Sequence, residues 1–280
     1  MRMMEGRSEE RLDRFYSIFP WHDDPESERG KRYFEASVDT MEKLAQHPWL
    51  QGKKALKVLE VCGGAGFGGV ALAKVLGQRG IAVDLTITDL RAEALEKARR
   101  WGTGILGRGV KTAVLDAREV HKLKEKYDLV LIYGLSTPHF DPWEFARLLA
   151  SVGEALEDEG IFAVEESDRR YRIFLMIGYK WALAEATEEK FTVSFHAGYD
   201  FHRGTVRRIY TELGKPEELV EMETYMWGLA EVGAFLWLFF EEVDFLRLRN
   251  ERYFILGRKP RRSLGPASLE LPAFLRGHAP

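Results

Sequence analysis

The sequence has very few residues of several kinds, and each scarcity excludes a class of protein. Its single cysteine, Cys62, excludes an internal disulfide and a cysteine-rich zinc site, and predicts a reducing, cytoplasmic setting. The most apolar stretch, residues 232–240, is far shorter than the roughly 20 residues that a membrane helix needs. The N-terminus has no apolar segment followed by a cleavage site of small residues. We therefore expect a soluble protein with no membrane partner.

The chain also lacks an excess of either charge. It has 41 Lys and Arg against 44 Asp and Glu, a net charge of -3, which argues against dedicated nucleic-acid binding. Charged residues still make up 30% of the chain, beside three Gln and one Asn, a bias typical of thermophile proteins. With 45% apolar residues, the 280-residue chain can build a large buried core.

Between residues 54 and 166, short β-branched segments alternate with helical periodicity. This alternation is typical of a doubly wound α/β fold with a parallel sheet. Asp141 followed by Pro142 predicts a helix start, because Asp is a favoured N-cap and Pro a favoured first helical residue. The expected strands are 55–61, 81–88, 110–115, 127–133 and 160–164, and the expected helices are 67–78, 91–101 and 142–156, with a short helical connection at 121–126.

The pattern changes after residue 166, which predicts an insertion at about 167–215. An apolar helix over 172–186 and a hairpin of strands 191–196 and 205–213 are expected there. A helix over 216–232 and an antiparallel strand pair, 235–247 with 252–258, should follow. The predicted organisation is an N-terminal helical lid region over 1–53, a main domain over 54–260 and a loosely packed tail over 261–280.

A glycine-rich turn follows the first expected strand and opens the next helix. Gly64 and Gly66 allow the backbone to approach a ligand closely, and the helix N-terminus favours a negative group. With Gly69, and with Asp89 ending the second strand, the turn also fits the dinucleotide fingerprint. Glu60 separates the possibilities, because its carboxylate would repel a pyrophosphate and attract an ammonium group. A ligand with a carboxylate and an ammonium beside a ribose is an amino-acid nucleoside.

This acidic residue, the glycines and the second acidic residue resemble the class I S-adenosylmethionine-dependent methyltransferases. Asp116-Ala117 after the third strand, the fourth strand and the closing antiparallel pair extend the resemblance over about 54–166 and 216–259. The resemblance implies a Rossmann-like, mostly parallel seven-stranded sheet with an antiparallel last strand, plus an inserted helix and hairpin lid. It departs at Cys62, which stands where the family often has its first glycine.

The resemblance implies S-adenosyl-L-methionine as the cofactor and a role for each matching residue. Glu60 would orient the ammonium group, Asp89 would accept both ribose hydroxyls, and Asp116 would accept from the adenine amine. The alternative for Asp89 and Asp116 is that each is a helix N-cap, and the alternative for Glu60 is a solvated strand end. The remaining cofactor contacts would come from Gly63, Gly64, Gly66, Leu90, Ala117, Tyr133 and Gly134.

The methyl acceptor should lie beside residues 134–143, because ligands of open α/β sheets bind at the carboxyl ends of the strands. His139 is the candidate general base, and a merely packed loop histidine is the alternative. The hairpin histidines match no metal motif, so no metal is expected. Candidate substrate contacts, with core packing or a polar turn as the alternative, are Tyr33, His196, Tyr199 and His202.

Together these features predict methyl transfer to a small-molecule acceptor by in-line displacement, with alignment of the reactants supplying much of the rate. Two alternatives stay open. One is a methyltransferase that acts on tRNA or protein. The other is an NAD-dependent oxidoreductase, in which Asp89 would face the NAD ribose but Glu60 would have no role. The acceptor, its attacking atom and the formation of a homodimer are also open.

Overall fold

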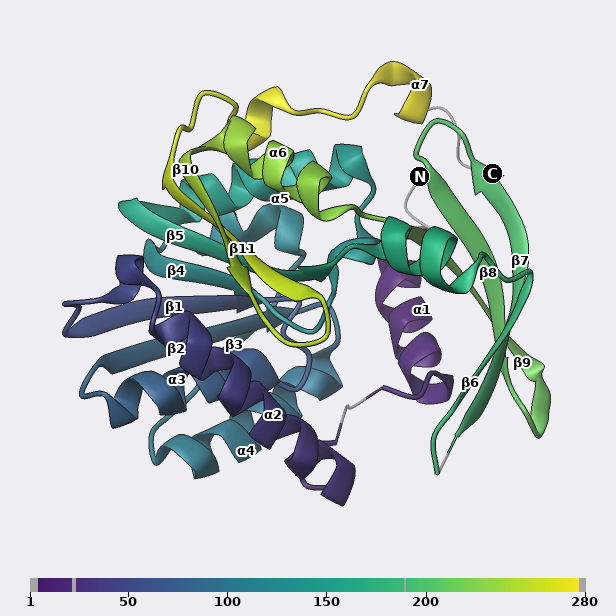
Figure 1. Ribbon diagram of the computed structural model, residues 1–280, viewed down its shortest axis with the longest axis horizontal. Helices are drawn as coiled ribbons and strands as arrows, with labels where there is room; N and C mark the ends of the chain where they lie inside the picture. Colours follow the sequence, from purple (N-terminus) through teal and green to yellow (C-terminus); the bar gives the residue numbers. More distant parts are fainter. Residues whose placement is uncertain (1–4, 22–23, 189, 277–280) are drawn as a thin grey trace.

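The computed structural model describes residues 5–21, 24–188 and 190–276. Figure 1 shows two sheets, a large one flanked by helices and a small one that stands apart from it. The large sheet has the strand order β10-β11-β5-β4-β1-β2-β3, and the small one has the order β6-β7-β8-β9. In the described part of the chain, no helix has the length and apolar character needed to cross a membrane.

The large sheet confirms the predicted doubly wound fold. Strands β1 to β5 are parallel neighbours, and β11 runs antiparallel to both β5 and β10. The predicted elements appear with small shifts at their ends, and β5 is longer than expected. They are β1 (Ala55–Val61), α3 (Phe67–Gln78), β2 (Ala82–Asp89), α4 (Ala92–Leu106), β3 (Lys111–Val114), η2 (Ala117–Leu123), β4 (Tyr127–Ile132), α5 (Pro142–Ala155) and β5 (Leu156–Ser167). The short turn η3 (Thr137–His139), between β4 and α5, was not predicted.

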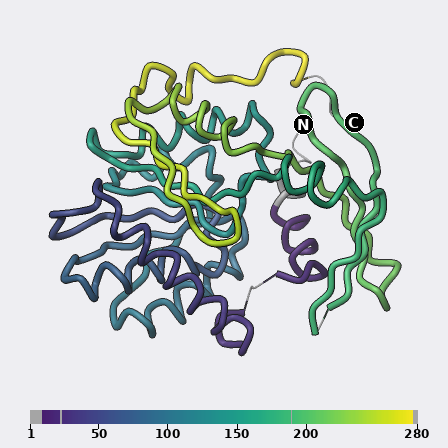
Figure 2. The backbone as a smooth tube through the Cα atoms, viewed as in Figure 1, coloured from purple at the N-terminus to yellow at the C-terminus, as the bar shows by residue number. Residues whose placement is uncertain are grey.

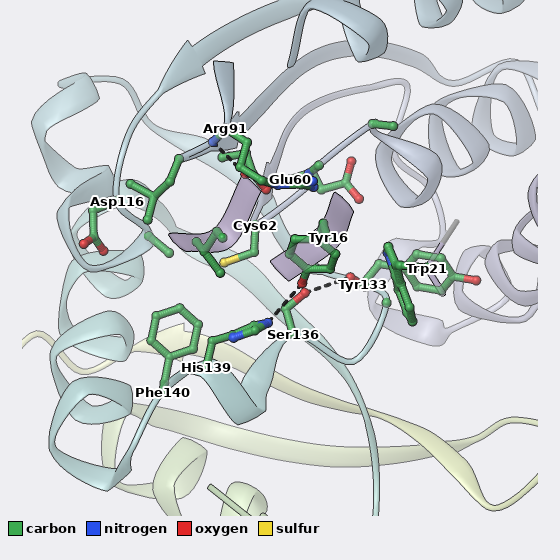
Figure 3. A pocket seen from close by; sticks show the side chains of 18 of the residues that line it. Tyr16, Trp21, Glu60, Cys62, Arg91, Asp116, Tyr133, Ser136, His139 and Phe140 are labelled. Atoms are coloured by element: carbon green, nitrogen blue, oxygen red, sulfur yellow. Dashed lines mark hydrogen bonds and ion pairs between the residues drawn. The ribbon is translucent and has the colours of Figure 1, made fainter. Parts of the chain in front are cut away.

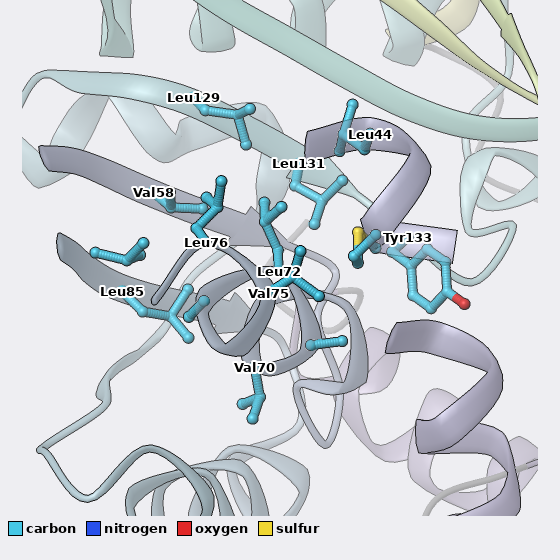
Figure 4. Packing of buried hydrophobic residues seen from close by; sticks show 14 of the residues in the cluster. Leu44, Val58, Val70, Leu72, Val75, Leu76, Leu85, Leu129, Leu131 and Tyr133 are labelled. Carbon is cyan, nitrogen blue, oxygen red and sulfur yellow. The ribbon is translucent and has the colours of Figure 1, made fainter. Parts of the chain in front are cut away.

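Two apolar layers hold this sheet between its helices. On one face, Leu72 and Leu76 of α3 are fully buried against Val58 and Leu85 of the strands. Figure 4 shows α3 seated in this layer, with Leu44 of α2 (Glu28–Ala45) close by. On the other face, α5 and α6 (Leu229–Phe239) contribute a second buried cluster. The sheet is therefore rigid on both faces, and its carboxyl edge is held in place.

The insertion corrects the prediction of an apolar helix over 172–186. Only η4 (Tyr171–Ile177) is helical, as a short π-helix, and none of its residues is buried. Residues 182–186 instead form β6 (Ala182–Ala186), which pairs with β7 (Phe191–Asp200). The apolar run misled the prediction because a continuous apolar segment carries no periodicity that separates helix from strand.

The predicted helix over 216–232 is also wrong. Residues 215–225 form β9 (Lys215–Tyr225), which pairs with β8 (Thr205–Glu212) and completes a four-stranded sheet. Val220 and Met222 are buried while Glu221 and Glu223 are exposed, an alternation that fits a strand with one covered face. The insertion therefore extends to residue 225, beyond the predicted limit of 215.

The N-terminal helix α1 (Glu5–Ile18) covers the inner face of the small sheet. Its Phe15 and Ile18 are buried against Tyr210, Val220 and Met222. In Figures 1 and 2, α1 lies between the two sheets. A residue near the start of the chain can therefore reach the edge of the large sheet. The short turn η1 (Pro48–Leu50) follows α2.

The closing strands confirm the predicted antiparallel pair, with one change. The first strand, β10 (Phe240–Arg247), begins five residues later than expected, because α6 takes up the preceding apolar residues. It pairs with β11 (Arg252–Pro260). The tail contains η5 (Pro266–Ser268) and α7 (Ala273–Arg276), and the predicted tail residues 277–280 lie outside the described residues.

Candidate active site

A cavity of about 210 Å³ lies at the carboxyl ends of β1, β2 and β4. Figure 3 shows its lining side chains converging from the sheet, from α1 and from the loop after β4. Gly66 is the one predicted cofactor residue that does not line it; this glycine instead caps α3. The predicted residues that do line it are Tyr33, Glu60, Gly63, Gly64, Asp89, Leu90, Asp116, Ala117, Tyr133, Gly134 and His139.

The glycine turn is held by its own backbone. The N–H of Gly63 donates to the carbonyl of Thr88 at 2.9 Å, and the N–H of Gly66 donates to the carbonyl of Gly63 at 2.7 Å. Gly64 and Gly66 have φ angles of 53° and 79°, in the left-handed region. Cys62, where the sequence departs from the family pattern, also has a positive φ of 55°. Cys62 thus adopts the left-handed backbone conformation that glycine adopts more readily, although it carries a side chain.

Glu60 is almost completely buried in the wall of this cavity, 1% exposed. Burial raises the pKa of its carboxyl group to about 8, although the backbone N–H groups of Gly69 and Gly68 act in the opposite direction. Its Oε2 makes no hydrogen bond of acceptable geometry with the described residues. A buried carboxylate oxygen with unused acceptor capacity fits the ammonium group of S-adenosylmethionine.

Asp89 connects the glycine turn to the start of α4. Its Oδ2 accepts the N–H of Gly64 at 2.8 Å, and its Oδ1 accepts the N–H of Arg91 at 2.9 Å. The guanidinium of Arg91 pairs with the same carboxylate, with Nε 3.4 Å from Oδ1, and lies 4.2 Å from the ring centroid of Tyr16. The carboxylate therefore lines the cavity in a fixed orientation.

The carboxylate of Asp116 has less free hydrogen-bond acceptor capacity than those of Glu60 and Asp89. Its carboxylate caps η2 by accepting the N–H of Arg118 at 2.8 Å, and it forms an ion pair with the guanidinium of the same arginine. Arg118 in turn pairs with Glu144. Burial alone would raise the pKa of Asp116, but Arg118 holds it below its usual value. An adenine amine would have to share this carboxylate with Arg118.

The far end of the cavity brings α1 against the loop after β4. The hydroxyl of Tyr16 lies 3.0 Å from Nε2 of His139, and Figure 3 shows the two side chains pointing toward one another. Burial, followed by the positive charge of Arg169, lowers the pKa of His139 to about 4. The imidazole is therefore neutral at neutral pH. It can form a hydrogen bond with an acceptor, but it is a weak proton acceptor.

The three hairpin candidates do not reach the cavity. Nδ1 of His196 lies 2.7 Å from the hydroxyl of Tyr179, and the backbone carbonyl of His202 accepts from Trp143 at 3.0 Å. Tyr199 is exposed and stacks edge-on with Phe201. The described residues contain no cluster of three His, Cys, Asp or Glu side chains that could hold a metal. Strand β9 lines the cavity instead, through Met222 and Glu223.

Several lining residues were not among the sequence candidates. Tyr16 stands beside Phe15, close to Phe19 and Trp21, and only the packing of α1 shows that Tyr16 faces the cavity while Phe15 faces the small sheet. The alternation along β9 does not predict Glu223, because it places this residue on the face opposite Met222. Arg91 and Arg118 each lie two residues after a predicted acidic cofactor contact, Asp89 and Asp116 respectively. This spacing suits a local ion pair.

Comparisons with known proteins agree with this geometry. Residues 58–160 match a family model described as a methyltransferase domain. No curated protein matches the chain. Among solved structures, the PH0226 protein from Pyrococcus horikoshii OT3 is 20% identical, with a TM-score of 0.61 over 88% of this chain and 98% of that one.

Two further solved structures share the fold at lower identity. CalS10, an amino pentose methyltransferase from Micromonospora echinaspora with S-adenosylmethionine bound, is 15% identical, with a TM-score of 0.52 over 82% of this chain and 93% of that one. The sugar N-methyltransferase KedS8 from Streptoalloteichus sp. ATCC 53650 is 14% identical, with a TM-score of 0.52 over 81% and 88%.

The family match, the strand order and the cavity together define residues 58–160 as a class I methyltransferase domain. Its cofactor is S-adenosylmethionine, and the open acceptor capacity of Glu60 and the orientation of Asp89 fit that molecule. The predicted family and cofactor are thus confirmed, and the NAD-dependent alternative has no support in these findings.

Proposed function

We propose that this chain transfers the methyl group of S-adenosylmethionine to an amine of a small-molecule acceptor. The observation that carries the proposal is the Tyr16–His139 pair, which forms one wall of the cavity beside Tyr133 and Gly134. The pair presents a hydroxyl and a neutral imidazole, two groups that bind an amine through hydrogen bonds.

The choice of an amine follows from the weakness of the available base. A neutral amine can attack a sulfonium methyl carbon without first losing a proton, whereas an alcohol needs a base during the attack. Since the pKa of His139 is about 4, it is poorly suited to remove a hydroxyl proton. In the proposed transfer a nitrogen–carbon bond forms, the carbon–sulfur pair stays on sulfur, and the proton leaves the product amine afterwards.

The other walls of the cavity support the same acceptor class. Aromatic rings of Tyr16, Trp21 and Tyr33 line it, and so does Glu223 of β9. Aromatic faces and a carboxylate favour a ligand that carries a basic nitrogen. Two proteins of similar fold are described as an amino pentose methyltransferase and a sugar N-methyltransferase, which makes amino sugars the first acceptors to test.

The test is transfer of a labelled methyl group to a matched panel. Purified chain and labelled S-adenosylmethionine are incubated with amino sugars, with the corresponding sugars that carry a hydroxyl in place of the amine, and with tRNA and protein fractions. Label should enter the amino sugars and should be lost with Asp89→Ala. Label in the hydroxyl sugars, or in tRNA or protein alone, would overturn the proposal.

A further inference from the structure

The loop after β4 has a backbone that needs external support. Gly134 and Leu135 have φ angles of 85° and 61°, two consecutive residues in the left-handed region. Residues with a side chain rarely adopt this conformation, so Leu135 must be held by its surroundings. The conformation turns the chain so that Ser136 and His139 line the cavity.

Two side chains that do not line the cavity hold these two residues. Oε2 of Glu165 accepts the N–H of Gly134 at 2.9 Å, and Nη2 of Arg169 donates to the carbonyl of Leu135 at 3.0 Å. Glu165 lies two residues before the end of β5, where it pairs with Phe254 of β11, and Arg252 of β11 donates to its Oε1 at 3.2 Å. The N–H of Gly134 and the carbonyl of Leu135 thus both have hydrogen-bond partners, one on β5 and one in the segment after it.

Arg169 is itself held by a buried carboxylate. Its Nε lies 3.1 Å from Oε1 of Glu166, which is completely buried, and its backbone N–H donates to the carbonyl of Trp227 at 2.9 Å. The indole of Trp227 donates to the carbonyls of Thr137 and Phe140, at the far end of the same loop. The guanidinium therefore has little freedom to leave Leu135.

We propose that Arg169 is a positioning residue of the acceptor site, which acts through Leu135 to hold His139 against Tyr16. The guanidinium anchors the first turn of the loop, and the imidazole four residues later depends on that anchor for its direction. The link to methyl transfer rests on the proposed function, whereas the effect on His139 does not.

The electrostatics of the imidazole give an independent sign of this arrangement. Arg169 is the charged group with the largest effect on the pKa of His139, and it lowers that pKa in addition to burial. The other groups that face the ring are the Tyr16 hydroxyl from α1, Asp89, which raises the pKa, and Arg91 and Arg11, which lower it. Loss of Arg169 should therefore change both the position and the titration of the imidazole.

The first experiment uses the full chain without an acceptor. Histidine resonances are followed by NMR from pH 8 to pH 5 in the native chain, in Arg169→Ala and in the matched control Arg170→Ala, whose arginine pairs with Glu231 instead. His139 should stay neutral in the native chain and the control, and should titrate at least one pH unit higher in Arg169→Ala. Affinity for S-adenosylhomocysteine should stay within twofold in all three, because neither arginine lines the cavity.

The second experiment measures transfer to the best amine of the panel described above. Arg169→Ala should lower kcat about tenfold, while Arg169→Lys should keep the native titration of His139 but restore only part of kcat, since an ammonium cannot bridge Glu166 and Leu135 as the planar guanidinium does. Full kcat in Arg169→Ala would overturn the proposal.

One further variant keeps the proposal open to test if Arg169→Ala does not fold. Glu166→Gln leaves the arginine in place but removes the carboxyl group that holds its Nε, and it should change the His139 titration by a smaller amount than Arg169→Ala does. Native titration of His139 in every variant that folds would overturn the proposal. If no amine is methylated, the proposed function fails, but the titration result still decides the role of Arg169.

Discussion

The two ends of the cavity are assembled in different ways. At the cofactor end, Glu60, Gly64 and Asp89 come from two neighbouring parallel strands and the turns that follow them. At the proposed acceptor end, Tyr16 and His139 are 123 residues apart in the sequence, and Glu223 comes from a strand of the small sheet. Local backbone geometry builds the first end, and packing between distant segments builds the second.

This difference decides how each end responds to change. The cofactor end uses left-handed backbone and hydrogen bonds within the β1–α3 and β2–α4 turns, so a substitution there acts on the turn itself. The acceptor end depends on α1 staying packed between the two sheets through Phe15 and Ile18. Substitutions at the acceptor end should therefore change transfer while leaving cofactor affinity nearly intact.

The largest effect is expected for Asp89→Ala at the cofactor end. The variant loses the acceptor of the Gly64 N–H and the proposed ribose contact, hydrogen bonds to a charged group that are worth about 1–3 kcal/mol. Titration calorimetry with S-adenosylhomocysteine should show a loss of affinity of about 10- to 100-fold. Asp84→Ala, an exposed carboxylate on the same strand, is the control and should bind normally. Equal affinity in both variants would contradict the assignment.

Much of the cofactor end could be predicted from the sequence. The alternation between residues 54 and 166 gave the strands in order, and the glycines with Glu60 and Asp89 indicated the ligand, because each signal lies within one β–turn–α unit. The engagement of Asp116 by Arg118 could not be predicted, since a carboxylate two residues before an arginine can pair with it or point elsewhere.

The acceptor end was largely hidden from the sequence. His139 was found because it follows β4, but its partner Tyr16 was one of several aromatic residues in the N-terminal segment, and only α1 packing on β8 and β9 decides which of them faces the cavity. The hairpin histidines looked suitable by residue type, yet the hairpin tip contacts α5, where Arg203 pairs with Asp141. Long-range packing of this kind has no local signature.

The next largest effect is the loss of stability at acid pH that His139, at the acceptor end, should cause. The pKa of His139 is about 4 in the folded chain and about 6.5 in an unfolded one, so the unfolded chain binds a proton between these values that the native chain does not. Stability should therefore fall as the pH is lowered through this window, by about 2 kcal/mol at pH 5 relative to pH 8. His139→Asn should remove this loss in urea unfolding at the two pH values.

Replacement of a histidine outside the cavity, His202→Asn, serves as the control for that measurement. If His139→Asn and the native chain lost the same stability between pH 8 and pH 5, the imidazole would not be held neutral by its surroundings.

Glu60, at the cofactor end, should make stability depend on pH in the opposite direction. Its folded pKa of about 8 lies above the unfolded value, so the native chain keeps a proton that the unfolded chain loses, and this contribution to stability falls as the pH rises from about 4.5 to 8. Glu60→Gln should stabilise the cofactor-free chain at pH 8 by about 1 kcal/mol, measured by urea unfolding, because it removes the cost of a buried carboxylate.

The same variant should bind S-adenosylhomocysteine about tenfold more weakly, since it loses the charge that faces the ammonium group. Binding to the native chain should also release a proton near pH 7, which calorimetry in buffers of different ionisation enthalpy detects. Glu60→Gln that is both less stable at pH 8 and unchanged in affinity would show that this carboxylate serves the fold alone.

The smallest effect is expected where the two ends meet, at Tyr16. Its hydroxyl contacts His139 at the acceptor end, while its ring lies over Arg91 beside Asp89 at the cofactor end. Tyr16→Phe keeps the ring and removes one hydrogen bond of about 1 kcal/mol, so transfer should slow about fivefold with cofactor affinity unchanged. Tyr16→Ala also removes the ring over Arg91 and should weaken S-adenosylhomocysteine binding. If Tyr16→Phe weakened binding as much as Tyr16→Ala, the hydroxyl would also contribute to cofactor binding. The assignment of the hydroxyl to the acceptor end and of the ring to the cofactor end would then be wrong.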